Sequence, residues 1–303
     1  MAIGVFDART AQFLNDMDRI ASRLDKAQQQ LTSGRKINAV SDSPDQISHL
    51  LATRSELAAT TQIHTNLNRV KGEVDAAESA LSQGVQVMDR ILSLGTQGAT
   101  AASMAGNRES LANEIGALLE QLVNIAGTRV DGRYLFSGDS DTTAPYTSDP
   151  NADPPYSAYQ GTASTRKVEH PSGSRIQVSL TAAEIFEDAD PGQNVFASVN
   201  DLRNALRASD LDQVKDALGR VRQSSAHLNN KLAFYGAAQN QVAEGLDTAS
   251  KQELRLQTQI SSIEDADLTA AILELNQARL QQTAALGAQG QLQNRKTLLD
   301  YLG

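Results

Sequence analysis

The side chains that could do metal or acid–base chemistry in this sequence are spread along the chain. His49, His64, His170 and His227 lie in separate segments. None has the His-x-x-x-His or Glu-x-x-His spacing that turns two ligands toward one metal ion. Cysteine is absent, which excludes thiolate metal sites, disulfides and cysteine nucleophiles. A Gly-x-Ser-x-Gly elbow and a phosphate-binding loop are also missing, so we expect no enzyme activity and no cofactor.

Two acidic clusters could attract a hard cation such as calcium. One consists of Asp139 and Asp141, and the other of Glu187, Asp188 and Asp190. Neither fits a complete calcium loop, because no bidentate Glu closes it. Solvated loops are therefore expected at both places, with no metal site.

Composition favours long helices and excludes two partner classes. The chain has 303 residues, of which 40% are hydrophobic and 4% aromatic, with no tryptophan. Its net charge of −9 opposes general binding to nucleic acid. No membrane span is visible, and Asp7 and Asp16 lie where a signal peptide would be basic and then apolar. We expect neither nucleic acid nor membrane as a partner, and no cleavable signal peptide.

The breaker residues separate a middle region from two helical flanks. Six of the seven prolines lie between Pro145 and Pro191, so helices can run without interruption through 45–144 and 192–303. Ser43 followed by Pro44 predicts the start of one long helix, and Asn107 is expected to cap another. In the middle region we expect a strand at 133–136. We also expect a hairpin at 166–180, with its turn at 171–173.

A heptad pattern runs through the C-terminal flank. From Leu211 to Ile263, thirteen of sixteen positions at alternating steps of three and four are apolar or aromatic. Such a seam predicts one helix of about 50 residues that packs along other helices.

The predicted fold is mainly α, a long antiparallel helical rod or coiled-coil bundle formed by both chain ends, with a small β-rich inserted middle domain. The predicted divisions are a terminal helix at 1–40, the N-terminal half of the bundle at 41–132, the inserted domain at 133–194, the C-terminal half at 195–262 and a second terminal helix at 263–303.

Each terminal helix carries an apolar stripe that needs a partner. The N-terminal stripe comprises Phe6, Phe13, Met17, Ile20, Leu24 and Leu31. The C-terminal stripe comprises Leu268, Ile272, Leu275, Leu286, Leu292, Leu299 and Leu302.

Two segments carry a family resemblance. The run Leu31-Thr-Ser-Gly-Arg-Lys-Ile-Asn38, followed by Ser41-Asp-Ser-Pro44, resembles the N-terminal signature of the bacterial flagellin superfamily. The run Ile263-Glu-Asp-Ala-Asp-Leu268 resembles its C-terminal signature. Gly132-Arg-Tyr-Leu-Phe-Ser-Gly138, Thr143-Ala-Pro-Tyr146 and the ending Leu298-Leu-Asp-Tyr-Leu302 are more similar to the hook-associated junction members than to flagellins.

The resemblance implies a structural subunit that joins hook to filament and polymerises through its terminal helices. Those helices would stay largely unfolded in the exported monomer and pair as an inner coiled coil on assembly. The implied partners are other copies in a ring or tube, a neighbouring hook-associated protein, flagellin and an export chaperone. The implied location is the extracellular flagellum, reached by type III export. Gly34, Arg35 and Asn38 of the signature would join the two stripes in the assembly interface.

Two other functions remain open at this stage. Gln281, Gln282 and the Ala–Gln repeats resemble a flagellin, the filament subunit. A coiled-coil signalling or adhesin protein is the weaker alternative, because such rods do not usually recover their seam after a β-rich insertion.

A possible immune-receptor site also follows from the resemblance. Arg90, Leu94, Gln97 and Glu114 match flagellin positions that the animal receptor for flagellin contacts. Positions 90, 94 and 97 share one face of the expected helix. The chain departs from the flagellin pattern at Leu92 and Ser93, which removes an arginine and a glutamate.

Overall fold

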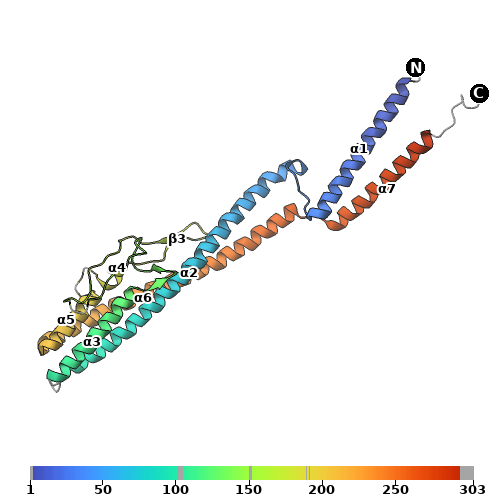
Figure 1. Ribbon diagram of the computed structural model, residues 1–303. Helices are drawn as coiled ribbons and strands as arrows, with labels where there is room; N and C mark the ends of the chain where they lie inside the picture. Colours follow the sequence, from blue (N-terminus) through green and yellow to red (C-terminus); the bar gives the residue numbers. More distant parts are fainter. Residues whose placement is uncertain (1–2, 101–104, 150–151, 189, 191, 294–303) are drawn as a thin grey trace, which may run out of the picture. The chain divides into compact units, whose positions relative to one another are not determined.

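The computed structural model describes residues 3–293 except 101–104, 150–151, 189 and 191 (Figure 1). Its helices are α1 (Ile3–Ser33), α2 (Pro44–Gly98), α3 (Ala105–Ala126), α4 (Ala182–Phe186), α5 (Val195–Ala208), α6 (Leu211–Glu264) and α7 (Leu268–Gln293), with a 3-10 turn, η1, at Val40–Asp42. Its strands are β1 (Arg129–Val130), β2 (Arg133–Tyr134), β3 (Lys167–Glu169) and β4 (Arg175–Gln177). The predicted mainly helical fold with a small β-containing middle is confirmed.

The chain divides into two compact units. Unit 1 comprises Met1–Ala59 with Gln252–Gly303, and unit 2 is Thr60–Lys251. Helices α1 and α7 belong wholly to unit 1, whereas α2 and α6 contribute residues to both units. Unit 1 therefore contains both predicted terminal stripes and both signature segments.

Helix α6 confirms the heptad pattern. It is one helix of 54 residues, and none of the sixteen seam positions is exposed. Two of the three polar seam positions have a clear structural setting. Ser225 is buried, and Gln239 donates to Asp75 of α2 over 3.0 Å. The spacing of three and four was thus sufficient to identify the buried face.

Local signals place some helix starts correctly. Helix α2 begins at Pro44, where a missing N–H costs nothing and the fixed φ suits the first turn. Asn194 caps α5, since its side chain accepts from the N–H of Ala197 over 2.8 Å. The predicted cap at Asn107 is wrong, because α3 already begins at Ala105.

The middle region packs into the core of unit 2 through aromatic side chains. Tyr235 of α6 is buried, lies edge-on to Phe136, and its hydroxyl accepts from the N–H of Leu180 over 3.0 Å. Phe186 of α4 stacks on Phe196 of α5 with ring centroids 5.0 Å apart. These contacts make the middle region part of the unit 2 core.

The strands of the middle region form two antiparallel pairs. β3 and β4 form the predicted hairpin, with Val168 opposite Ile176 and both buried. β2 ends at Tyr134, so the strand predicted for 133–136 is too long. Leu135 and Phe136 are both buried, whereas consecutive residues of a strand point to opposite faces.

Substitution of Gly138 should destabilise unit 2. Its φ is +66°, and an added Cβ would collide with the carbonyl oxygen of Thr162, whose backbone pairs with Ser137. We expect Gly138→Ala to cost at least about 2 kcal/mol in urea unfolding, from left-handed strain and displaced backbone. Gly132→Ala is the control, because Gly132 has a φ of +79° but open space, and should cost about 1 kcal/mol. Equal losses would show that the close approach to Thr162 is unimportant.

Candidate assembly interface

Helices α1 and α7 lie side by side and antiparallel in unit 1 (Figure 1). Small buried residues, Ala27 on α1 with Ala271 and Ala278 on α7, allow the two backbones to approach closely. Arg23 donates from Nε to Glu274 over 2.6 Å and from Nη1 to Gln281 over 2.9 Å. The Arg23 guanidinium holds the pKa of Glu274 below its usual value. The two chain ends thus form a two-helix pair.

The predicted stripe of α1 faces this partner. Phe13, Met17, Ile20, Leu24 and Leu31 are all half-buried, flanking the fully buried Ala27. Packing against α7 therefore covers only part of each side chain. The side chain of Phe6, which the prediction also includes, lies outside the described residues.

The predicted stripe of α7 lies mostly outside the pair. Leu275 is half-buried, but Leu268, Ile272 and Leu286 are exposed. Leu299 and Leu302 lie outside the described residues, as does the side chain of Leu292.

The sequence-based prediction missed two further exposed apolar residues of α7, Leu273 and Leu280. The five exposed side chains, Leu268, Ile272, Leu273, Leu280 and Leu286, have exposed fractions from 48% to 71%. They lie on different sides of α7, because positions 273 and 280 are turned by about 100° or more from 268 and 286.

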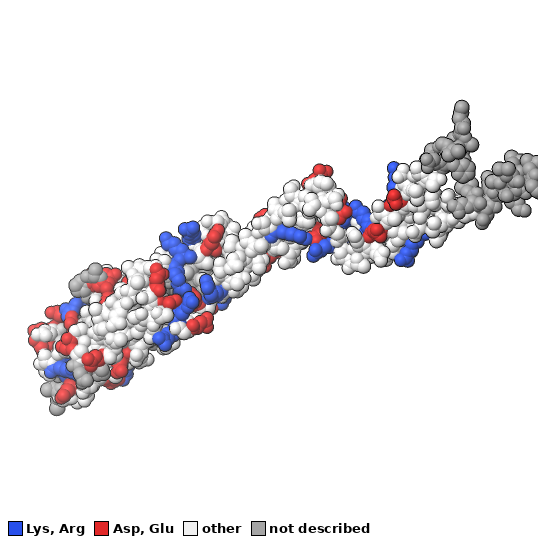
Figure 2. Space-filling model, turned by 45° about the horizontal axis from the view of Figure 1, so that its top comes forward, with Lys and Arg blue, Asp and Glu red and all other residues white. Residues whose placement is uncertain are grey.

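Around these side chains α7 carries only two charged residues, Glu274 and Arg279, and charged side chains are sparse on this face of the terminal helices in Figure 2. A helix that is apolar on several sides is normally buried on several sides. The described contacts of α7 leave most of that apolar surface open.

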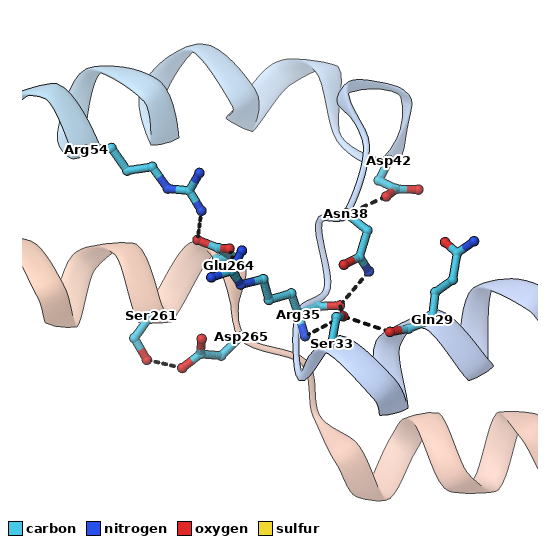
Figure 3. Close-up of polar contacts among 9 residues, drawn as sticks. All are labelled: Gln29, Ser33, Arg35, Asn38, Asp42, Arg54, Ser261, Glu264 and Asp265. Carbon is cyan, nitrogen blue, oxygen red and sulfur yellow. Dashed lines mark hydrogen bonds and ion pairs between the residues drawn. The ribbon is translucent and has the colours of Figure 1, made fainter.

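A compact polar cluster joins the two signature segments (Figure 3). The N–H of Lys36 donates to the carbonyl of Glu264 over 2.6 Å, and the N–H of Ala266 donates to the carbonyl of Gly34 over 3.0 Å. Gly34 has a φ of +69°, a conformation that favours glycine directly after α1. The backbone after α1 is thereby bonded to the backbone between α6 and α7.

Glu264 lies at the centre of this cluster. Its side chain is 5% exposed, forms an ion pair with Nε of Arg35 at 2.7 Å, and accepts from Nη2 of Arg54 over 2.5 Å. Both arginines are roughly half exposed, so their charges remain partly hydrated. A buried carboxylate depends on such partners, because an unpaired buried charge is costly.

Asn38 stabilises the turn that follows Arg35. Its side chain donates to the carbonyl of Arg35 over 3.0 Å, and its N–H donates to the Asp42 carboxylate over 2.9 Å. Asp42 also accepts from the N–H of Ala39, and these backbone bonds hold its pKa below the usual value. On the other segment Ser261 bonds to Asp265. Gly34, Arg35 and Asn38 thus lie close together and make these contacts within the chain, while their predicted role between subunits stays a prediction.

Glu264 and Arg54 carry no local sequence signal that predicts their pairing, although Glu264 lies within the C-terminal signature. The two residues are 210 positions apart, so no local spacing connects them. The sequence did contain one signal for Glu264. It is an acidic residue that directly follows the apolar seam positions Ile260 and Ile263.

Of the four predicted immune-receptor residues, three are exposed and one is buried. Arg90 forms a two-bond ion pair with Glu114 at 2.7 Å, and both are exposed, as is Gln97. Leu94 is 1% exposed in the unit 2 core, so its inclusion in a receptor-contact face is wrong. At 3.6 residues per helical turn, position 94 lies on the same buried face of α2 as positions 91 and 95.

The chemistry-bearing residues of the sequence form no metal centre in the described part of the chain. Within it, no group of three or more His, Asp or Glu side chains is placed to hold a metal ion. The buried His227 contacts the Gln193 side chain at 2.9 Å, and His49 contacts Gln259 at 3.0 Å. Nor does any helix among the described residues have the length and apolar character that a bilayer crossing requires.

Comparison with known proteins places this arrangement among flagellar proteins. Residues 8–141 match the model of the bacterial flagellin N-terminal helical region, and 211–302 match that of the C-terminal helical region. Flagellar hook-associated protein 3 of Escherichia coli is 26% identical over 80% of this chain and 82% of its own length. A flagellin of Listeria innocua is 21% identical over 91% of both chains.

Among solved structures, a putative flagellar hook-associated protein from Vibrio parahaemolyticus has the same fold. Its TM-score is 0.64 at 19% identity, over 74% of this chain and all of that one.

Proposed function

Because the chain belongs to the bacterial flagellin family, we propose that it is a non-enzymatic structural subunit of the flagellum that joins the hook to the filament. The observation that carries the proposal is the apolar surface left open on the α1–α7 pair. It gives the chain a surface for other subunits at the end where both family signatures lie. A filament-forming flagellin is the second candidate, supported by the similarity to the Listeria flagellin over 91% of the chain.

The junction role is favoured by two features. The similarity to E. coli hook-associated protein 3 has the higher identity of the two, 26% against 21%. The segment Gly132–Gly138, which resembles the junction proteins, adopts a specific conformation here. Gly132 and Gly138 both have positive φ, and the residue between them, Phe136, is buried beside Tyr235.

The assembly interface that we propose consists of the two terminal stripes together with Gly34, Arg35 and Asn38. On assembly, the exposed leucines of α7 would be covered by neighbouring copies in a ring or tube. Burial of one such side chain contributes roughly 1.5–3 kcal/mol. In this proposal the two outer segments of the chain, 1–40 and 263–303, are the assembly elements. The segments between them are the two halves of the bundle and the inserted domain, at 41–132, 195–262 and 133–194.

The wider set of partners belongs to the same proposal. We expect a neighbouring hook-associated protein below the subunit, flagellin above it and a chaperone before export. We also expect the subunit to leave the cell by type III export. Arg90, Gln97 and Glu114 remain available for the proposed immune-receptor contact.

A deletion strain tests the proposal. We expect electron microscopy to show hooks without filaments and immunoblots to show flagellin in the medium, because filament subunits would have no junction to add to. Restoring the gene on a plasmid should restore filaments. Loss of filaments without any flagellin in the medium would instead identify the chain as the filament subunit. Normal filaments would contradict both functions.

A further inference from the structure

We propose that a cavity between α3 and α5 in unit 2 binds a small oxyanion, a phosphate or a carboxylate. The cavity has a volume of about 240 Å³. Its lining includes Asn113, Gly116 and Glu120 of α3 and Arg203 and Arg207 of α5. This site does not depend on the proposed junction function.

Arg203 is a buried cation with weak partners. It is only 6% exposed, yet its Nη2 lies 3.3 Å from Asp153 Oδ1, and its other contacts within the described residues are with Asn204 Oδ1 at 3.4 Å. Arginine–carboxylate hydrogen bonds are normally about 2.7–2.9 Å long. The same Asp153 oxygen also accepts from Asn200 over 3.1 Å and from Asn204 over 3.4 Å. The buried guanidinium therefore retains unused capacity to donate hydrogen bonds.

Arg207 adds a second guanidinium one helical turn away. Its contact in the described residues is with the side-chain oxygen of Asn113 at 3.3 Å. Burial and the neighbouring charge of Arg207 hold the pKa of Arg203 below its usual value. An oxyanion between the two guanidinium groups would relieve this repulsion and supply the missing acceptors, and the amide nitrogen of Asn113 could donate to it as well.

Gly116 keeps the cavity open. Glycine in the middle of a helix weakens the helix relative to alanine, so its presence in α3 calls for a local reason. A Cβ at this position would lie 3.5 Å from Cδ of Arg203, and a larger side chain would extend into the cavity. The absence of a side chain at 116 leaves room for a ligand beside the buried guanidinium.

Glu120 reduces the positive charge of the site. It is exposed, and within the described residues it forms no ion pair with Arg203 or Arg207. Its carboxylate would repel an anion at the rim. The oxyanion should therefore bind more tightly to the Glu120→Gln variant. This expected gain in affinity tests the proposal in the direction opposite to the loss expected from removing an arginine.

The test uses thermal unfolding of the full chain in sodium phosphate or sodium acetate, each compared with sodium chloride at the same ionic strength. At phosphate far above its dissociation constant we expect the unfolding midpoint of unit 2 to rise by about 5 °C. An equal rise with acetate would assign the site to carboxylates, such as an acidic side chain of a neighbouring subunit. A rise with phosphate alone would assign it to free phosphate.

Variants separate the cavity from general effects of salt. Arg207→Gln should abolish the rise, and since Arg207 is exposed this change should leave the fold intact. Arg222→Gln, which removes another exposed positive charge, this one from α6, should leave the rise in the midpoint unchanged. Gly116→Leu should also abolish the rise, because it fills the cavity and leaves both arginines in place. If neither anion raises the unfolding midpoint, or if the rise persists in Arg207→Gln, the proposal is overturned. Any anion found in the cavity would then be an adventitious ion only.

Discussion

Leu286→Asp should abolish motility and leave unit 2 as stable as before. Leu286 is 54% exposed in the described chain, so a charge there meets water in the free subunit. In the assembled junction the same position would be covered by another copy. Burying an unpaired carboxylate costs several kcal/mol, enough to prevent assembly when it is repeated in every subunit.

The measurement combines swimming assays and immunoblots of secreted flagellin with thermal unfolding of the purified chain. We expect loss of swimming, flagellin in the medium, and an unfolding midpoint of unit 2 within about 1 °C of the original. Leu286→Met is the control, because it keeps an apolar side chain of similar size and should swim. A large fall in the unfolding midpoint would place Leu286 in the core of the monomer. Phe13→Asp is less decisive, since Phe13 is already half-buried against α7.

Removing both arginines around Glu264 should open the polar cluster more than removing Glu264 itself. The double change Arg35→Gln with Arg54→Gln leaves a carboxylate that is 5% exposed without a cationic partner, at a cost of about 3–5 kcal/mol. Glu264→Gln removes the buried charge and returns two half-exposed arginines to water. Its cost should be only about 1–2 kcal/mol. Adding Glu264→Gln to the double change should therefore restore part of the lost stability.

Hydrogen exchange at the amides of Lys36 and Ala266 gives the measurement, because both amides bond across the cluster. A loss of about 3 kcal/mol corresponds to exchange roughly 150 times faster. Equal acceleration in Glu264→Gln and in the double change would contradict the asymmetry. If both amides exchange at the free-chain rate in the original protein, the cluster forms only on assembly, as the family resemblance implies.

The sequence predicts those features of the structure that depend on residues close together in the chain, and it misses those that depend on residues far apart. The seam of α6 and the start of α2 at Pro44 follow from spacing and local chemistry, and both are correct. The strand at 133–136 failed because the burial of Leu135 and Phe136 is decided by tertiary packing, which includes the contact of Phe136 with Tyr235 of α6. The role of Glu264 could not be read locally, because Arg35 and Arg54 approach it only after folding.

The interface shows the same limit in another form. Large apolar residues identified α7 as an amphipathic helix, but its buried contact with α1 uses Ala271 and Ala278. Alanine gives little hydrophobic signal and is selected here for close approach of backbones. The sequence pattern therefore assigned the apolar stripe to one face of α7, while Leu273 and Leu280 lie on another.

The pairing of the two chain ends also determines when they can meet during folding. Arg23 and Glu274 are 251 residues apart, so closing the loop between them directly carries a large entropic cost. Within unit 2, however, a Cβ at Gly245 would lie only 3.1 Å from Leu67, so the folded unit 2 already brings the preceding and following segments together. Pairing of α1 with α7 should therefore be the last step of folding, after unit 2 has formed. During that interval the unpaired ends of one molecule can also pair with the ends of another, which gives the growing structure a kinetic window for exchange between neighbours.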